Sequence, residues 1–285
     1  MPALPFFDLP GPAFLNFFGV VAISVLLTSF LVIYFADRSG RLPPPAVPAE
    51  PAAMTTALLS GGVGRVIQTL VYDLDERGYL VLGDEGHINP TGKKPADGEL
   101  DEMELRLLAA VRHGPTARQL FEDKALRRHL FIDLASVRAQ LAADDLIQPA
   151  SVRQAKRWAQ AIGTIIILAV AALKLQIVLA TENANPSYLI YLTLASIGAL
   201  FALGYVLTRE TASKRGLALV EAMRLAYADK LKETLTQIRS PGPQARAFGG
   251  ASLFLIGLYG FSSLKGTTES KFVEAFQDAS GNCDE

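Results

Sequence analysis

The stretch AFLNFFGVVAISVLLTSFLVIYFA, Ala13–Ala36, decides the fold because it runs for 24 residues without a charged side chain. WAQAIGTIIILAVAALKLQIVLA, Trp158–Ala180, carries Lys174 alone, and SYLIYLTLASIGALFALGYVLT, Ser187–Thr208, carries no charge. At a rise of about 1.5 Å per residue, each is long enough for a helix across about 30 Å of hydrocarbon. The charged share of the chain, 19%, is also below the roughly 25% of soluble domains. The sequence therefore predicts a mainly α-helical membrane protein with three transmembrane helices.

The first stretch is predicted to be an anchor that stays on the protein. Met1–Phe7 contains no Lys or Arg, whereas a secretory signal peptide begins with a basic segment. Tyr34 and Phe35 stand where a signal peptide would need small residues for cleavage.

The basic residues beside the three stretches predict the orientation, because Lys and Arg next to spans stay on the cytoplasmic side. The connector Thr181–Pro186 has none, and neither does the segment before Ala13. We therefore expect a bacterial inner-membrane protein with its N-terminus outside and its C-terminus in the cytoplasm, and with Lys174 reaching the external headgroups. The flanking basic residues are Arg38 and Arg41, then Arg153, Lys156 and Arg157, and finally Arg209, Lys214 and Arg215.

These boundaries divide the chain into eight segments. Five prolines between Leu42 and Pro51 favour an extended spacer there. The predicted segments are an external N-terminus (1–12), a first span (13–36), a Pro-rich linker (37–51), a cytoplasmic region (52–157), a second span (158–180), a third span (187–208), a cytoplasmic amphipathic helix (209–240), and an apolar element with a polar tail (241–285).

The region 52–157 shows the pattern of a winged helix. Apolar residues at three- and four-residue steps from Val63 to Leu74 predict a helix, and Gly78 is the glycine expected after its C-terminus. Tyr79–Leu82 and His87–Asn89, joined by Gly83–Gly86, then predict a β-hairpin. Further helices are expected at Leu100–Val111, Thr116–Glu122 and Leu126–Leu146.

A winged helix raises the possibility of nucleic-acid binding. The candidate contact residues are Arg65, Gln68, Thr69, Tyr72 and Arg77. Acidic residues crowd the end of the same helix, and residues 37–157 hold 16 Lys and Arg against 17 Asp and Glu. Nucleic acid is an unfavourable partner for such a region, because most non-specific affinity comes from basic side chains on phosphates.

Two segments give the chain a family resemblance. Leu58–Arg65, which contains Gly61 and Gly62, and Leu74–Leu80 resemble the motif of the TIGR04222 domain family, a group of uncharacterised bacterial membrane proteins. The resemblance implies an N-terminal span, a Gly-Gly-containing helical region, two close spans and a polar helical tail. It implies no activity.

Candidate chemistry is sparse, and we expect no cofactor, no metal and no catalytic site. Ser60–Arg65 opens a helix whose backbone amides are suited to an anion, but a P-loop needs a Lys followed by Ser or Thr. A tight turn between two helices explains Gly61 and Gly62 equally well. The histidines, His87, His113 and His129, lack ligand spacing. The acidic residues Glu99, Asp101, Glu102 and Glu104 suit a solvated helix N-terminus.

The C-terminal region predicts an interaction surface. Val220, Met223, Tyr227 and Leu231 form one apolar stripe of a helix over Lys214–Ile238, and we expect this face to dock on the chain's own cytoplasmic region or on a partner. Ala247–Leu264 is apolar but short, so it is either a packed or interfacial element or a marginal fourth span. Cys283 is the single cysteine and excludes an intramolecular disulfide.

From these observations we expect a membrane-anchored scaffold or sensor that binds another protein. The alternatives are a membrane-tethered nucleic-acid-binding regulator and a membrane enzyme with a site that no motif reveals. The sequence names neither the partner nor the oligomeric state.

Overall fold

The computed structural model describes residues 11–43, 45–83, 86–179, 187–207, 212–239, 249–265 and 270–281. The chain is mainly helical and separates into two compact units. Met1–Arg38 and Gln148–Glu210 form the first, which we call the membrane unit. Ser39–Ile147 and Thr211–Glu285 form the second, which we call the composite domain because it joins two separate chain segments.

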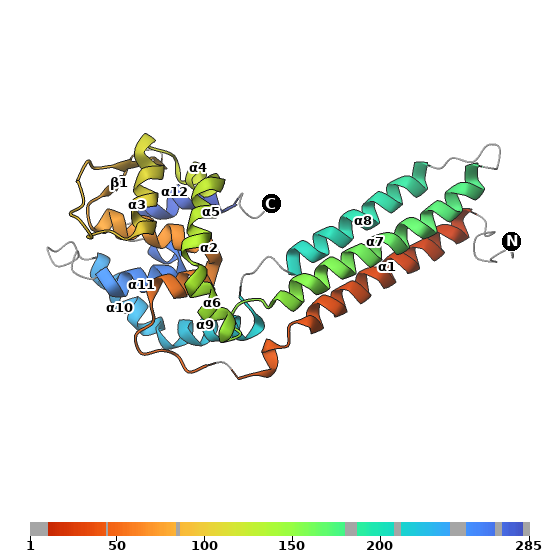
Figure 1. Ribbon diagram of the computed structural model, residues 1–285, viewed down its shortest axis with the longest axis horizontal. Coiled ribbons are helices and arrows are strands. Elements are labelled where there is room, and N and C mark those ends of the chain that lie inside the picture. The colour runs from red at the N-terminus through yellow and green to blue at the C-terminus, as the bar shows by residue number, and fades with distance from the viewer. Residues whose placement is uncertain are drawn as a thin grey trace. The chain divides into compact units, whose positions relative to one another are not determined.

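The membrane unit consists of α1 (Gly11–Ala36), α7 (Ala150–Leu179) and α8 (Ser187–Leu207), which lie side by side (Figure 1). Within the described residues, three helices are long and apolar enough to cross a membrane, so the prediction of three such helices is confirmed. The middle helix begins earlier than Trp158 and takes in its basic flank. The qualifying stretches are Ala13–Ala36, Ala150–Gln176 and Ser187–Val206.

Close packing at a small residue holds this unit together. A Cβ placed on Gly163 of α7 would lie 2.8 Å from Leu200 of α8 and 2.9 Å from Val25 of α1. Hydrocarbon tails are as apolar as these side chains, so helices in a membrane gain mainly from such close van der Waals contact. Exposed Trp158 begins the apolar part of α7, and exposed Tyr188 is the second residue of α8; aromatic side chains are enriched at such boundaries of membrane spans.

The side chain of Lys174 lies against the first turn of α1. Its side chain is 8% exposed, and Nζ lies 4.9 Å from the ring centroid of Phe14. An ammonium over an aromatic face is attracted by the ring quadrupole. The structure therefore places this charge inside the helix bundle, against α1.

The composite domain is built around α2 (Ala53–Glu76) and α11 (Gly249–Tyr259). A Cβ on Gly257 would lie 2.9 Å from the Ala53 carbonyl oxygen, so this glycine lets the two helices approach closely. Leu255, Ile256 and Leu258 are buried in the domain core. The short apolar stretch within 247–264 is thus packed against α2 here, and it is not among the membrane-length helices of the described residues.

A small hairpin follows α2. Its strands β1 (Leu80–Leu82) and β2 (Ile88–Pro90) are antiparallel, with Leu80 opposite Pro90. Residues 84 and 85 of the predicted turn lie outside the described residues. The next elements are α3 (Glu102–Ala110), η3 (Val111–His113), α4 (Ala117–Glu122), α5 (Lys124–Asp133) and α6 (Ala135–Ala143).

Two helices predicted as continuous are bent. Leu126–Leu146 becomes α5 and α6, which meet at Leu134, and the C-terminal helix becomes α9 (Lys214–Ala226) and α10 (Ala228–Arg239), which meet at Tyr227. Hydrogen bonds of helical spacing continue through both positions. Leu134 is fully buried, and Tyr227 packs against the core, so tertiary contacts at these positions accompany the bends.

Aromatic rings complete the core. η5 (Phe261–Leu264) and α12 (Ser270–Gly281) follow α11. Phe272 lies 5.1 Å from Phe261 and 5.7 Å from Tyr72, measured between ring centroids. The C-terminal segment therefore supplies part of the core around α2.

Candidate functional site

The Gly-Gly motif lies at a kink of α2. Gly61 has φ −159° and Gly62 has φ 64° with ψ −156°, so neither is helical, although helix runs on both sides of them. The conformation of Gly62 belongs to a region that is nearly exclusive to glycine. The hydroxyl of Ser60 donates a hydrogen bond to the Gly257 carbonyl, which ties the kink to α11. These glycines thus have a backbone role at the turn.

Gly78 ends α2 in a Schellman motif. Its φ is 74°, the Gly78 amide donates to the Asp75 carbonyl, and the Tyr79 amide donates to the Leu74 carbonyl. A glycine fits here because a left-handed backbone carries no steric cost without a Cβ.

Arg77 beside it connects α2 to α3. Its guanidinium lies 2.6 Å from Glu104 and 3.1 Å from Asp73. Asp101 and Glu104 form a capping box at the start of α3, but Glu104 is only 7% exposed. Burial raises the pKa of the Glu104 carboxyl. The expectation that all four acidic residues of this segment are solvated is therefore wrong for Glu104, which is drawn inward by Arg77.

Arg65 occupies a slot between two glycines. A Cβ on Gly61 would lie 2.9 Å from Arg65 Cβ, and a Cβ on Gly260 would coincide with the Arg65 Nη1 position. Its guanidinium donates to Gln68 Oε1 at 3.0 Å. Gly260 follows α11 directly, so the slot joins the Gly-Gly motif to the C-terminal segment.

Arg65 lines a cavity of about 220 Å³ in the composite domain. Its polar lining comes from α2 and from the segment around η5, and its apolar lining from η5 and α12. We call this space the Arg65 cavity. Its lining residues are Arg65, Gln68, Phe261, Ser262, Lys265, Val273 and Phe276.

The electrostatics of the Arg65 cavity are one-sided. Burial lowers the pKa of the Arg65 guanidinium, and the nearby Arg224 guanidinium lowers it further. Among the residues that the structure describes, no carboxylate forms an ion pair with Arg65 or Lys265.

The apolar stripe of the C-terminal helix is largely internal. Val220 and Met223 are 4% and 3% exposed, and Tyr227 and Leu231 pack against the same core. The Tyr227 hydroxyl donates to the Pro48 carbonyl at 2.7 Å, and its ring lies 4.7 Å from that of Phe254. This conformation therefore leaves little of the stripe for a separate partner. Residues beyond Thr234 in α10, including Ile238, have no described side chain.

Three chain segments meet at Arg215 within the composite domain. They are Ser39–Pro43, which follows the first span, Asp144–Ile147, which precedes the second, and Ala212–Gly216, which follows the third. The Arg215 side chain donates to the Pro43 carbonyl at 2.9 Å and to the Asp144 carbonyl at 2.7 Å, and its amide donates to Ser39 Oγ at 3.3 Å. We call this meeting point the junction.

Further bonds close the junction. Ile147 and Ala212 form an isolated antiparallel bridge, and the Ser213 amide donates to the Leu146 carbonyl at 2.9 Å. Ser213 is fully buried, caps α9 by accepting from the Gly216 amide, and donates to the Asp145 carbonyl at 2.5 Å. A Cβ on Gly216 would overlap the Leu146 carbonyl oxygen. These hydrogen bonds thus join the two ends of the 64-residue segment 148–211 inside one domain.

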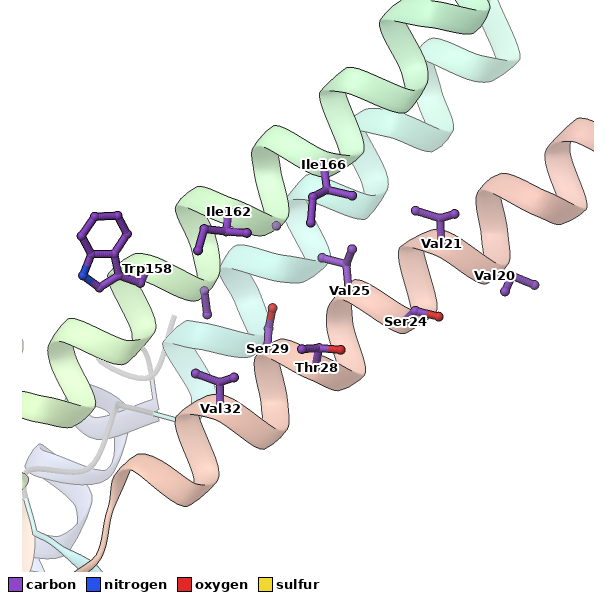
Figure 2. Close-up of a pocket in the computed structure, with 12 residues that line it drawn as sticks. Val20, Val21, Ser24, Val25, Thr28, Ser29, Val32, Trp158, Ile162 and Ile166 are labelled. Carbon is purple, nitrogen blue, oxygen red and sulfur yellow. The ribbon is translucent and has the colours of Figure 1, made fainter. Parts of the chain in front are cut away.

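A second cavity, of about 430 Å³, lies between α1 and α7 in the membrane unit. Figure 2 shows Val25, Ser29 and Val32 of α1 on one side and Trp158 and Ile162 of α7 on the other. Its lining is mainly apolar.

Several of these residues are not predictable from local sequence. Arg215 is recognisable only as a charge beside a span, and the roles of Ser213, Gly216 and Gly260 depend on contacts distant in sequence. Ser213 carries a local signal, since serine is a favoured N-cap residue. No group of three or more His, Cys, Asp or Glu in the described ranges is placed to hold a metal. Cys283 and the connector Thr181–Pro186 lie outside the described residues.

Comparison of the chain with protein-family models, with curated proteins and with solved structures finds no match in any of the three.

Proposed function

We propose that this chain is a membrane-anchored sensor or scaffold of the bacterial inner membrane, and that its composite domain faces the cytoplasm and binds another protein. The observation that carries the proposal is the junction. Arg215 holds together the three segments that lead to the three spans, so a displacement at any of them acts on one set of hydrogen bonds.

The junction also bears on topology. Ser39–Ile147 and Thr211–Glu285 form one compact unit. A domain that packs as one body lies on one side of a membrane, which supports a topology with the adjoining ends of all three spans on that side. In this proposed topology the N-terminus lies on the other side. The basic residues Arg38, Arg41 and Arg153 favour the cytoplasm for the composite domain.

The junction is continuous with the domain core, which favours a sensing role. Leu146 and Ala212, on the two sides of the junction, belong to the same buried cluster as Leu70 of α2. A change of lipid or of a membrane partner that shifts the span ends would thus alter packing around α2. Coupling of this kind requires that α2 and its neighbours can adopt two different packing arrangements.

A winged-helix-like arrangement is part of the proposal. The hairpin of β1 and β2 gains a third short strand-like contact, because the Ile88 amide donates to the Pro115 carbonyl at 2.9 Å and His87 pairs with Thr116. The resemblance of the Gly61–Gly62 segment to the TIGR04222 domain family supports the same layout.

A protein is favoured over nucleic acid as the partner. Of the side chains considered for base contacts, Thr69 and Tyr72 are 0% and 5% exposed. A recognition surface must be accessible, and the balanced charge of residues 37–157 supplies little attraction for phosphates.

Reporter fusions test the topology. A cytoplasm-active and an export-active reporter would be fused after Pro44 and after Asn183 of the full chain. We expect the Pro44 fusion to report the cytoplasm and the Asn183 fusion the exterior. The same side for both positions would contradict the proposal.

Amide hydrogen exchange tests the coupling. The full chain would be placed in lipid nanodiscs of two bilayer thicknesses, and exchange in Val63–Leu74 would be compared. We expect a difference between thicknesses in the native chain and a smaller difference in Arg215→Gln. Arg118→Gln is the matched control, because Arg118 is an exposed arginine paired with Glu122 on its own helix. Equal exchange in both bilayers for the native chain would remove the sensing role.

A further inference from the structure

We propose that the Arg65 cavity binds a phosphate group, carried either by a small phosphorylated molecule or by a lipid headgroup. The site is unrelated to the amides at the start of the second half of α2 and is formed instead by side chains. It also stands apart from the proposed partner binding, since it needs no second protein.

The first argument is that Arg65 is held in place. The space left by Gly61 and Gly260 accepts its side chain, and Gly260 has φ 74°, a conformation that favours glycine. The hydrogen bond to Gln68 fixes one edge of the guanidinium. Arginine is a rigid fork of donors that matches phosphate geometry, and a slot of this kind removes the cost of ordering it.

The second argument is the set of donors around the cavity. Arg65 and Lys265 are cationic and Gln68 adds an amide, whereas the Ser262 hydroxyl donates to the Tyr259 carbonyl at 3.1 Å. Phe261 and Phe276 form an apolar wall, which strengthens charge–charge attraction by excluding water. A phosphate accepts several hydrogen bonds and carries up to two negative charges, so it suits two cations and an amide donor better than chloride does.

The third argument is size. The cavity measures about 220 Å³, below the roughly 300 Å³ at which pockets for drug-sized ligands begin. It therefore suits one phosphate group and not a whole nucleotide. The rest of a phosphorylated molecule would extend past Lys265, whose side chain is exposed.

A structural role for Arg65 is the competing explanation. α11 ends at Tyr259, beside the slot, and a cation near a helix C-terminus is stabilising. However, Arg224 already donates to the Leu258 carbonyl at 3.4 Å, whereas the Arg65 hydrogen bond goes to Gln68. If Arg65 were purely structural, Lys265 would take no part in anion binding. Replacing Lys265 would then leave the affinity for an anion unchanged, which can be measured.

The test uses the full chain in a maltoside detergent, which contains no phosphate. Its unfolding temperature would be followed with increasing inorganic phosphate, against chloride at matched ionic strength. We expect a saturable rise with phosphate alone. Lys265→Gln should raise the half-saturating phosphate concentration by about tenfold or more, because one charge-assisted contact is lost. Lys94→Gln, which removes an exposed lysine elsewhere in the domain, should leave it unchanged.

Arg65→Lys provides a second variant. It keeps the positive charge, so it can be used even if the neutral substitution Arg65→Gln prevents folding. It should also weaken phosphate binding, since an ammonium lacks the planar fork. The proposal is overturned if phosphate acts no differently from chloride on the native chain, or if Lys265→Gln binds phosphate as Lys94→Gln does.

The two sources of phosphate are separated in nanodiscs. Discs of phosphatidylcholine would be compared with discs that also contain phosphatidic acid. A lipid headgroup in the cavity predicts that phosphatidic acid raises the unfolding temperature and reduces the effect of added phosphate. A soluble ligand predicts an equal effect of added phosphate in both discs.

Discussion

The membrane unit and the composite domain are stabilised in different ways. In the membrane unit, Phe18, Ile167 and Leu200 lie inside a bundle that also exposes many large apolar side chains on its outer face. In the composite domain, Leu70, Leu107 and Phe272 are buried by two chain segments that the membrane hairpin separates. Burial removes apolar surface from water only in the second case. Equal burial in the two units therefore corresponds to unequal contributions to stability.

The largest expected effect tests this difference directly. Phe272→Ala in the composite domain should cost about 3–5 kcal/mol of unfolding free energy, the usual range for a buried Phe. Phe18→Ala in the membrane unit should cost clearly less, because lipid tails replace part of the lost contact. Urea unfolding of the full chain in detergent, monitored by amide hydrogen exchange in each unit, measures both losses of stability. Equal losses would mean that the two units share one mode of stabilisation.

The kink of α2 gives the next effect. Gly62→Val should destabilise the composite domain by roughly 2 kcal/mol, because φ 64° with ψ −156° is closed to a β-branched residue. The membrane unit should be unaffected. Gly198→Ala is the control, since a Cβ on this glycine of α8 meets no atom within 4 Å. Thermal unfolding of both variants would measure the loss of stability. An unchanged midpoint for Gly62→Val would contradict the backbone role.

A smaller effect concerns the attachment of the linker. Tyr227→Phe keeps the ring against Phe254 but removes the hydroxyl that donates to the Pro48 carbonyl. We expect a loss of about 1 kcal/mol, as for a typical hydrogen bond. Proteolysis within the Pro-rich linker 37–51 should become faster.

Tyr227→Glu, which also places a charge beside Phe254, should loosen α2, and this is seen as faster amide exchange. Unchanged exchange would contradict docking of this face.

The smallest expected effect is a pH dependence. Burial raises the pKa of the Asp75 carboxyl, opposed in part by the Lys271 ammonium. A carboxyl with a higher pKa in the folded state binds its proton more tightly there, so its contribution is complete below the unfolded value of about 3.9 and is lost as the pH rises through the folded value. The stability of Asp75→Asn relative to the native chain should therefore increase as the pH rises from the unfolded pKa of about 3.9 through the higher folded pKa. A gain that is independent of pH would contradict this assignment.

The three spans follow from composition, and so does their number. Ala13–Ala36 and Ser187–Thr208 are apolar on every side, and a segment of this length satisfies its backbone groups within its own helix. No distant contact is required for that conclusion. Gly78 was also predictable, because a helix pattern followed by glycine is a local signal for a left-handed C-terminal residue.

The tertiary structure decided what local pattern leaves open. The packing of Gly249–Tyr259 against α2 depends on Gly257 meeting Ala53, which is more than 200 positions away in the chain. The bend at Tyr227, the slot of Arg65 and the convergence on Arg215 likewise arise from residues far apart in the chain. Periodicity reports which side of a helix is apolar, but not which surface covers it, because that choice is made by packing among segments brought together only on folding.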